Sequence, residues 1–306
     1  MHSGLISFVV PSFNRAHRIE RALRSVLDEP NGGEAEIIVV DDGSTDVTQT
    51  VLAPYLERGV ICVRHASNLG VGPARNHGVA RATGEWIVFL DSDNALLPGA
   101  FRRLQILAGG AGERTGGLFP ACCDPDGHLI SGDGLEGPLD FEGYIRSAHR
   151  MEERLPVLRR ELLLEFPYRE APGIRRECSS VVVLNILRAG WDFQLLPDVL
   201  QEYDNRSEDR ICDRKYLRLH ALEMVDTYGW LLTCFGPDLR RVNRLYYLEL
   251  LRKIVVYSLL AEQYLSAREN WITAAREQWW HWSNWALAAL AACPPALRHK
   301  IADIVL

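Results

Sequence analysis

The chain of 306 residues is longer than a usual single domain, so we expect one large domain or two fused domains. An apolar fraction of 47% is enough for a hydrophobic core, and a formal net charge of −6 argues against a general nucleic-acid-binding protein. Seven cysteines without a Cys-x-x-Cys pair argue against a disulfide framework or a structural zinc site. With no signal peptide and no apolar run of the ~18–20 residues that span a membrane, we expect a cytoplasmic protein.

Strands and helices are expected to alternate through the first 110 residues. Apolar runs predict strands, and apolar residues at helical spacing predict the helices between them. The expected strands are 5–10, 34–40, 60–64 and 85–90, and the expected helices are 15–27, 45–56, 73–81 and 98–107. Alternation at this spacing predicts a parallel, doubly wound sheet.

The fourth expected strand ends in two aspartates. The run from Trp86 to Leu90 is typical of a strand buried on both faces, and Asp91 and Asp93 follow it directly. Open α/β sheets bind ligands beyond the carboxyl ends of their strands. Two carboxylates so close repel each other unless a cation lies nearby, and Mg²⁺ or Mn²⁺, which also bind diphosphates, suit oxygen ligands. The alternative is a strand end followed by a turn rich in Asp and Asn.

Three expected strands deliver polar groups to the same edge of the sheet, in residues 11–15, 41–44 and 91–94. In a nucleotide site, the ring of Phe13 can stack on a base and the carboxylate of Asp41 can accept a hydrogen bond from a ring N–H. Each residue also has a structural alternative: Phe13 as ordinary packing, Asn14 as a cap, and Asp42 as part of a turn. The convergence of all three segments favours a nucleotide site.

Four motifs in this order and spacing resemble family 2 glycosyltransferases: Val9 to Arg15, Ile37 to Asp46, Asn68 to Asn76 and Gly84 to Asp93. The resemblance covers roughly residues 5–110. It implies a GT-A fold, with a mostly parallel sheet between helices, and an inverting single displacement at the anomeric carbon. It also implies a nucleotide-sugar donor, by default a UDP-sugar, and a divalent metal, Mn²⁺ or Mg²⁺.

The resemblance also implies roles for single residues by matching position. The residues expected to bind the nucleotide are Pro11, Phe13, Asn14, Arg15, Asp41, Asp42, Arg75, Asp91 and Ser92. Pro11, Phe13 and Asp41 would surround the base, while Asp42 and Arg75 would lie near the ribose and diphosphate. The two aspartates of the fourth strand, Asp91 and Asp93, would bind the metal.

A base must remove the proton from the acceptor hydroxyl, and family members usually carry an acidic pair before a helix for this purpose. Glu177 lies about where that pair is expected, ahead of a helix expected over 181–188, but Cys178 replaces the second acid. Glu177 is therefore the expected catalytic base, and its alternative is a first-turn residue favourable to the helix dipole. Competing candidates for the base are Glu170, Asp192 and Asp204.

The remaining expectations concern chain organisation. Short strands are expected at 118–121 and 128–130, and a strand with its return at 193–203. After a polar linker at 204–213, helices are expected at 214–235, 238–267 and 269–292, with a short one after residue 295. We expect a nucleotide-sugar-binding half (1–110), an acceptor-side half (111–205) and a helical C-terminal extension (206–306).

Five tryptophans gather near the end of this extension: Trp271, Trp279, Trp280, Trp282 and Trp285. Core packing, a surface for a sugar acceptor, and a patch that contacts the inner face of a membrane are three interpretations of them. Peripheral membrane contact and oligomerisation therefore stay open.

The sequence as a whole predicts a metal-dependent inverting glycosyltransferase that acts on a hydroxyl of a glycan, a lipid-linked glycan or a small molecule. One alternative is a catalytically inactive GT-A-like binding or scaffold subunit, because the second acid beside Glu177 is missing. The other is a sugar nucleotidyltransferase, which the segment Pro11 to Asn14 disfavours because it is not a Gly-rich, basic loop.

Overall fold

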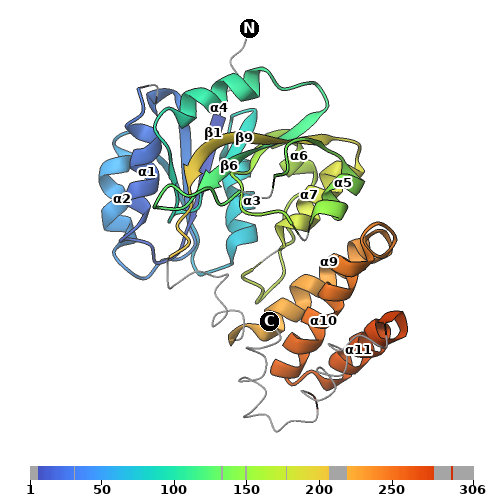
Figure 1. Ribbon diagram of the computed structural model, residues 1–306. Helices are drawn as coiled ribbons and strands as arrows, with labels where there is room; N and C mark the ends of the chain where they lie inside the picture. Colours follow the sequence, from blue (N-terminus) through green and yellow to red (C-terminus); the bar gives the residue numbers. More distant parts are fainter. Residues whose placement is uncertain are drawn as a thin grey trace. The chain divides into compact units, whose positions relative to one another are not determined.

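The computed structural model describes residues 6–30, 32–131, 134–148, 150–176, 178–206, 219–278 and 291. The chain divides into two compact units, Met1–Ser207 and Glu208–Leu306 (Figure 1). The first unit is a sheet covered by helices, and the described part of the second is helical.

The first half of the sheet confirms the predicted alternation of strands and helices. Its strands are β1 (Ile6–Ser12), β2 (Glu36–Asp41), β3 (Ile61–Arg64) and β4 (Trp86–Phe89). Its helices are α1 (Ile19–Leu27), α2 (Thr48–Leu56), α3 (Val71–Arg81) and α4 (Ala100–Gly109). The four strands pair in parallel in the order β3-β2-β1-β4, so all their carboxyl ends lie at one edge.

The second half extends the same sheet with mixed pairing. Its elements are β5 (Ala95–Leu96), β6 (Thr115–Cys123), β7 (Gly137–Leu139), α5 (Phe141–Ser147), β8 (Val157–Arg159), α6 (Arg160–Glu165), α7 (Ser179–Arg188) and β9 (Asp192–Glu202). Strand β8 pairs antiparallel with both β4 and β6, and β9 lies parallel to β6. The carboxyl end of β9 therefore lies at the same edge as that of β4.

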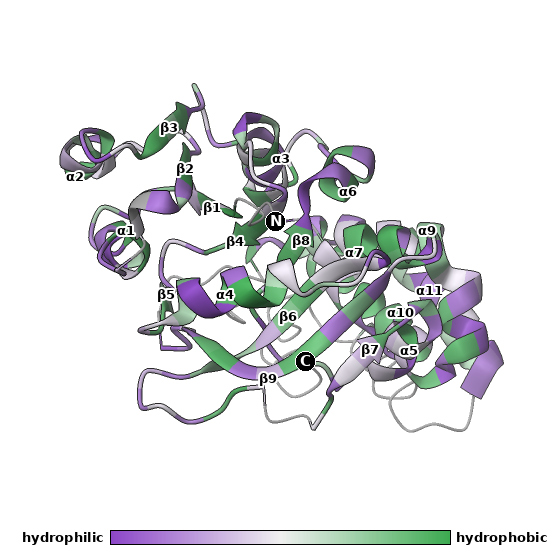
Figure 2. Cartoon of the chain, turned by 90° about the horizontal axis from the view of Figure 1, so that it is seen from above, coloured by the Kyte–Doolittle hydropathy of each residue, from purple (hydrophilic) through white to green (hydrophobic). Residues whose placement is uncertain are grey.

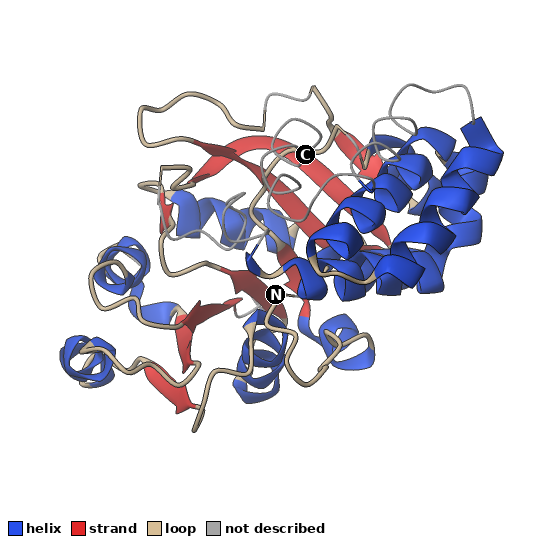
Figure 3. Cartoon of the chain, turned by 90° about the horizontal axis from the view of Figure 1, so that it is seen from below, coloured by secondary structure: helices blue, strands red, loops and turns tan. Residues whose placement is uncertain are grey.

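Both faces of the sheet are buried, as the apolar strands predict. Phe8 and Val10 of β1 belong to a core cluster with α1, α2 and α4, whereas Val9 between them belongs to one with α3, α6 and α7. Successive side chains of a strand point to opposite faces, which explains this division. Figure 2 shows α1 and α4 on one side of the strands and α3, α6 and α7 on the other, and Figure 3 shows the same layers from below.

Between residues 124 and 165 the elements differ from the predicted ones. No strand forms at 128–130, where only Leu129 makes an isolated bridge to Cys123. This segment instead follows a turn that Asp124 stabilises by accepting from the backbone N–H groups of Asp126 and His128, each at 2.9 Å. The elements β7, α5, β8 and α6 were missed, although Asp140 is a recognisable N-cap that accepts from Gly143 N at 2.7 Å.

The second unit contains α9 (Ala221–Val242), α10 (Arg244–Leu260) and α11 (Tyr264–Gln278), and α10 packs against both others. The helix break predicted at residues 236–237 is wrong, because Pro237 lies inside α9. Pro237 removes one backbone hydrogen bond and its ring crowds the preceding turn, but the helix continues through it with Phe235 and Leu239 buried. The break falls at Asn243, whose side chain accepts from Tyr246 N at 3.1 Å and caps α10.

Four of the five C-terminal tryptophans, Trp279, Trp280, Trp282 and Trp285, lie outside the described residues, whereas Trp271 packs against a small core of α10 and α11. Among the described helices, none has the length and apolar character needed to cross a membrane.

Candidate functional site

The polar segments after β1, β2 and β4 meet at the carboxyl edge of the sheet. Ser12 and Asp41 are register partners, and Asp42 N donates to Ser12 O at 2.8 Å. On the other side of β1, Leu90 N donates to Val9 O at 3.1 Å. The strand order thus brings residues 11–15, 41–44 and 91–94 side by side.

The loop after β1 is fastened to the loop after β2 by Asn14. This residue has a left-handed φ of 54°, its backbone N donates to Ser44 Oγ at 2.9 Å, and its Oδ1 accepts from Thr45 N at 2.8 Å. Phe13 next to it is 39% exposed, a large fraction for a phenyl ring. Phe13 is therefore accessible for stacking, and Asn14 acts first as a connector between two loops.

Asp41 is fully buried and holds its own loop together. Its Oδ1 accepts from Ser44 N at 2.9 Å, and its Oδ2 accepts from the side chain of Gln49 and pairs with Arg64 Nε at 3.5 Å. A base N–H can reach this carboxylate only by sharing it with these donors, since each carboxylate oxygen has two lone pairs.

Asp42 is also buried, and it holds the loop that leads to α3. Its Oδ1 accepts from Leu69 N at 2.8 Å and bonds His65 Nδ1 at 2.7 Å, while its Oδ2 accepts from Gly70 N at 2.8 Å. His65 in turn bonds the exposed His77, with 2.7 Å between Nε2 and Nδ1. Asp42, which was expected near the ribose and diphosphate, is therefore bound by groups of the protein, and its carboxylate fixes the start of α3.

Arg75 of α3 reaches the site with a side chain that is only 12% exposed. It donates to Asp91 Oδ1 and to Ser179 Oγ, each at 3.2 Å, and lies over the rings of Phe89 and Tyr168 at 5.1 and 5.5 Å. Burial lowers the pKa of Arg75, but Tyr168 and Asp91 outweigh burial and raise it. Its Nε is buried without a hydrogen-bond partner. The site thus contains a permanent cation with a free donor.

The two aspartates after β4 differ in environment. Asp91 is 45% exposed, whereas burial and the charge of Asp91 raise the pKa of Asp93 to about 6, against the opposing effect of Arg15. The charge of Asp204, just beyond β9, also raises it. The sequence offers Asp204 only as a competing base. Nothing in its local sequence marks it as a neighbour of Asp93, because long-range pairing places β9 there.

A divalent cation fits these residues. Carboxylate oxygens are its preferred ligands, and the electrostatic cost that disfavours ionised Asp93 is what a nearby cation would offset. Ser12 Oγ, buried at the end of β1, also has no hydrogen-bond partner, and Ser92 is buried beside the two aspartates. Unused polar atoms at the edge of a sheet are typical of a site completed by a ligand.

A second acidic group, Asp124, Asp126 and His128, also brings possible ligand atoms together. Asp124 Oδ1 already accepts the two backbone hydrogen bonds of the turn described above, and Asp126 pairs with Arg206. The aspartates of β4 therefore remain the better candidate for a metal associated with a nucleotide.

Glu177 lies outside the described residues, but the chain before it is firmly placed. Val71 N donates to Arg175 O at 2.9 Å, and Gly70, with φ 103°, approaches so closely that an added Cβ would lie 2.5 Å from Arg175 Cα. Of its competitors, Glu170 accepts from Asn76 Nδ2 at 2.9 Å, and Asp192 begins β9 and so lies at the opposite edge of the sheet.

Comparison with known proteins decides the family of the first segment. Residues 7–109 match the family model described as glycosyl transferase family 2. This segment belongs to glycosyl transferase family 2. The chain is 39% identical over 107 residues to the succinoglycan biosynthesis protein ExoO of Rhizobium meliloti, a match that covers 35% of the chain and 30% of ExoO. It is 34% identical over 139 residues to the GalNAc(5)-diNAcBac-PP-undecaprenol beta-1,3-glucosyltransferase of Campylobacter jejuni, over 43% of each protein. The chain thus spans less than half the length of these relatives.

Solved structures extend the likeness over the whole chain and show that the fold is of the GT-A type. S. aureus TarS 1-349 in complex with UDP-GlcNAc matches with a TM-score of 0.59 and 17% identity, over 90% of this chain and 92% of that one. The mannosyltransferase PcManGT from Pyrobaculum calidifontis, in complex with GDP-Man and Mn²⁺, matches with a TM-score of 0.58 and 19% identity, over 99% and 84%. The predicted fold class, with its helical C-terminal region, is confirmed.

Proposed function

We propose that this chain is a metal-dependent inverting glycosyltransferase that moves a sugar from a nucleotide-sugar, most simply a UDP-sugar, to a hydroxyl acceptor. The observation that carries the proposal is the placement of Asp91, Asp93 and Arg75 at one edge of a family 2 sheet, beside the accessible ring of Phe13. Structural neighbours that hold UDP-GlcNAc or GDP-Man support a sugar linked to a nucleoside diphosphate.

In this proposal the edge of the sheet is divided between the base and the diphosphate. Pro11, Phe13 and Asp41 bind the base, with Asn14 and Arg15 in the same loop, as nucleotide-binding residues. Asp42 acts by fixing the loop at residues 69–70, and Arg75 lies near the ribose and diphosphate, as does Ser92 beside the nucleotide. A buried guanidinium with an unused Nε suits a phosphate oxygen, because charge-assisted hydrogen bonds are the stronger ones.

Asp91 and Asp93 would hold the cation, Mn²⁺ or Mg²⁺, and this cation would offset the negative charge that develops on the departing diphosphate. The neighbour PcManGT, whose structure contains Mn²⁺, supports the choice of ion. Before the donor binds, the carboxylates of Asp91 and Asp93 would be the ligands that the protein itself offers to the cation.

Glu177 is proposed as the base that takes the acceptor proton. The attachment of Arg175 to Gly70 and Val71 supports this assignment, since it fixes the chain two residues earlier beside the loop that Asp42 holds. Residues 1–110 would then form the donor half, 111–205 the acceptor half, and 206–306 a helical extension. For its location, we propose a cytoplasmic protein whose helical extension contacts the inner face of a membrane.

The test is release of nucleoside diphosphate from a panel of UDP-, GDP- and dTDP-sugars with Mn²⁺ or Mg²⁺, with and without sugar acceptors. We expect turnover with one donor class, its loss in EDTA, and a fall of roughly 10²-fold or more in Asp91→Asn and Glu177→Gln. Asp126→Asn is the matched control and should retain activity. Metal-dependent nucleotide binding without turnover of any donor would instead identify a binding subunit.

A further inference from the structure

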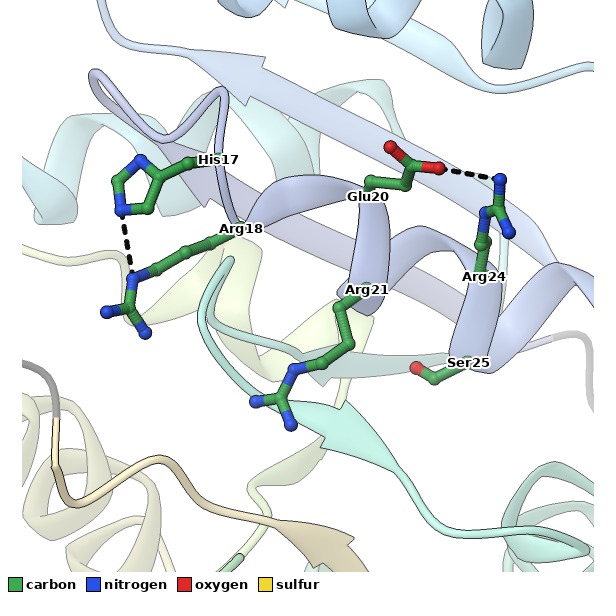
Figure 4. Close-up of a pocket in the computed structure, with 6 residues that line it drawn as sticks. All are labelled: His17, Arg18, Glu20, Arg21, Arg24 and Ser25. Atoms are coloured by element: carbon green, nitrogen blue, oxygen red, sulfur yellow. Dashed lines mark hydrogen bonds and ion pairs between the residues drawn. The ribbon is translucent and has the colours of Figure 1, made fainter.

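We infer that a hollow along α1, beside the donor site, binds an oxyanion carried by the acceptor, either a phosphate or a carboxylate. The inference rests on the proposed function, since it concerns the second substrate of the same reaction. The hollow has a volume of about 590 Å³ and is lined by His17, Arg18, Glu20, Arg21, Arg24 and Ser25 (Figure 4). The hollow is shallow and open to solvent, so it suits a charged group held at the surface.

Three arginines recur at the start of α1 and just before it. Arg18, Arg21 and Arg24 follow each other at intervals of three, and residues three apart lie on neighbouring positions of a helix surface. In Figure 4 the side chains of Arg18 and Arg21 extend to the same side of α1, whereas Arg24 turns toward Glu20. A second hollow shares Arg24 and Ser25 and continues to Arg102 of α4.

The three arginines are more accessible than the acids that accompany them. The exposed fractions of the side chains are 27% and 14% for Arg18 and Asp204, 43% and 27% for Arg21 and Glu202, and 60% and 48% for Arg24 and Glu20. Each arginine is thus more exposed than its acid, and Glu20 is the carboxylate in the hollow that an anion has to displace. The attraction is local, since the whole chain is acidic.

The existing ion pairs leave donors for a ligand. A guanidinium has five N–H groups, and the contacts of Arg24 are Nε to Tyr55 and Nη2 to Glu20, so its Nη1 remains available. Exposed ion pairs of this kind contribute only about 0–1 kcal/mol, so an oxyanion can replace Glu20 at little cost. Planar guanidinium groups also match phosphate and carboxylate oxygens in pairs.

Contacts of Arg21 and Arg18 tie the hollow to the donor site. Arg21 donates to the backbone oxygen of Asp93, and Arg18 pairs with Asp204, whose charge acts on Asp93. An anionic group held along α1 is therefore anchored at the edge where the donor's diphosphate is proposed to bind. We assign this ligand to the acceptor because the donor is proposed to bind at the ends of β1, β2 and β4.

The experiment titrates the whole chain with inorganic tripolyphosphate and, separately, citrate, by calorimetry in metal-free buffer. We expect binding of one or both probes, weakened roughly three- to tenfold by Arg24→Gln, which removes one charge-assisted contact. Glu20→Gln should strengthen binding several-fold, because it removes the competing carboxylate. A merely structural role of the Arg24–Glu20 pair would not give these opposite effects.

The matched control is Arg103→Gln, which changes an arginine on α4 that pairs with Asp198 and lines neither hollow. It should leave anion binding unchanged. Absence of probe binding, or equal effects in all three variants, would overturn the inference. So would complete displacement of the probe by UDP at a fixed free Mn²⁺ concentration, since the anion would then lie in the donor site. Failure of every nucleotide to bind, with the anion pattern intact, would count against the proposed function alone.

Discussion

The two halves of the sheet use their buried polar groups for different purposes. In the first half, the carboxylates of Asp41 and Asp42 hold the backbones of loops at the ends of β2 and before α3. In the second half, contacts such as Tyr144 to Ser180 join one helix to another, and Arg154 donates to carbonyls between strands. The first half therefore concentrates the residues of the proposed ligand-binding edge in short motifs, whereas these contacts of the second half hold its own elements together.

The largest expected effect tests where the two halves meet. Gly70→Ala should lower the free energy of unfolding by about 2–4 kcal/mol, because its Cβ would lie 2.5 Å from the backbone of Arg175 in a left-handed conformation. Gly59→Ala is the control, with a similar φ of 92° but nothing within 4 Å of the added atom, and should cost about 1 kcal/mol. Equal losses in urea unfolding would mean that the close approach to Arg175 does not matter.

The next effect tests whether Asp42 acts through its loop. Asp42→Asn removes one of the two acceptor oxygens and leaves a donor of His65, Leu69 or Gly70 unsatisfied, so we expect a loss of about 1–3 kcal/mol. Asp28→Asn, which removes an exposed ion pair with Arg58, should cost less than about 1 kcal/mol in the same denaturant titration. A loss in Asp42→Asn no larger than this control would show that the loop is held by other contacts.

A smaller effect concerns Asp93, whose ionisation is expected to lower the stability of the metal-free protein. Burial and the charge of Asp91 raise the pKa of Asp93 to about 6, so the folded metal-free chain retains a proton between about pH 4 and 6 that the unfolded chain has lost. Its stability should fall as the pH rises through this interval, because the unfolded state binds fewer protons there.

Asp93→Asn should remove this fall and stabilise the metal-free protein at pH 7 by about 1–2 kcal/mol. Thermal unfolding from pH 4 to 7 in EDTA measures both effects. Unchanged or lower stability of the variant at pH 7 would show that Asp93 is not under electrostatic strain. Asp91→Asn should reduce the same slope in part, since it removes one cause of the raised pKa.

The smallest effect belongs to the second half. Tyr144 donates to Ser180 Oγ at 3.0 Å, and burial raises the pKa of the tyrosine to about 12. Tyr144→Phe should cost about 1 kcal/mol, and a double-mutant cycle with Ser180→Ala should show a coupling of similar size. Additive losses in that cycle would contradict the direct contact between α5 and α7.

The sequence was sufficient for the fold of the first half because its strand and turn signals are local. Asp42, for example, directly follows β2 and holds the loop before α3. Strand β8 is only three residues long and pairs with segments far away in sequence, so no local pattern predicts it. For the same reason, the position of Asp204 beside Asp93 followed only from the pairing of β9.

Calorimetric titration of UDP and GDP, with Mn²⁺ or with EDTA, into the wild-type chain and Asp93→Asn tests the central claim most directly. We expect one nucleotide to bind the wild type at least tenfold more tightly with Mn²⁺ than with EDTA, and the variant to lose that difference. Equal affinities in Mn²⁺ and EDTA, or a variant that keeps the full metal effect, would contradict a cation held by the aspartates of β4.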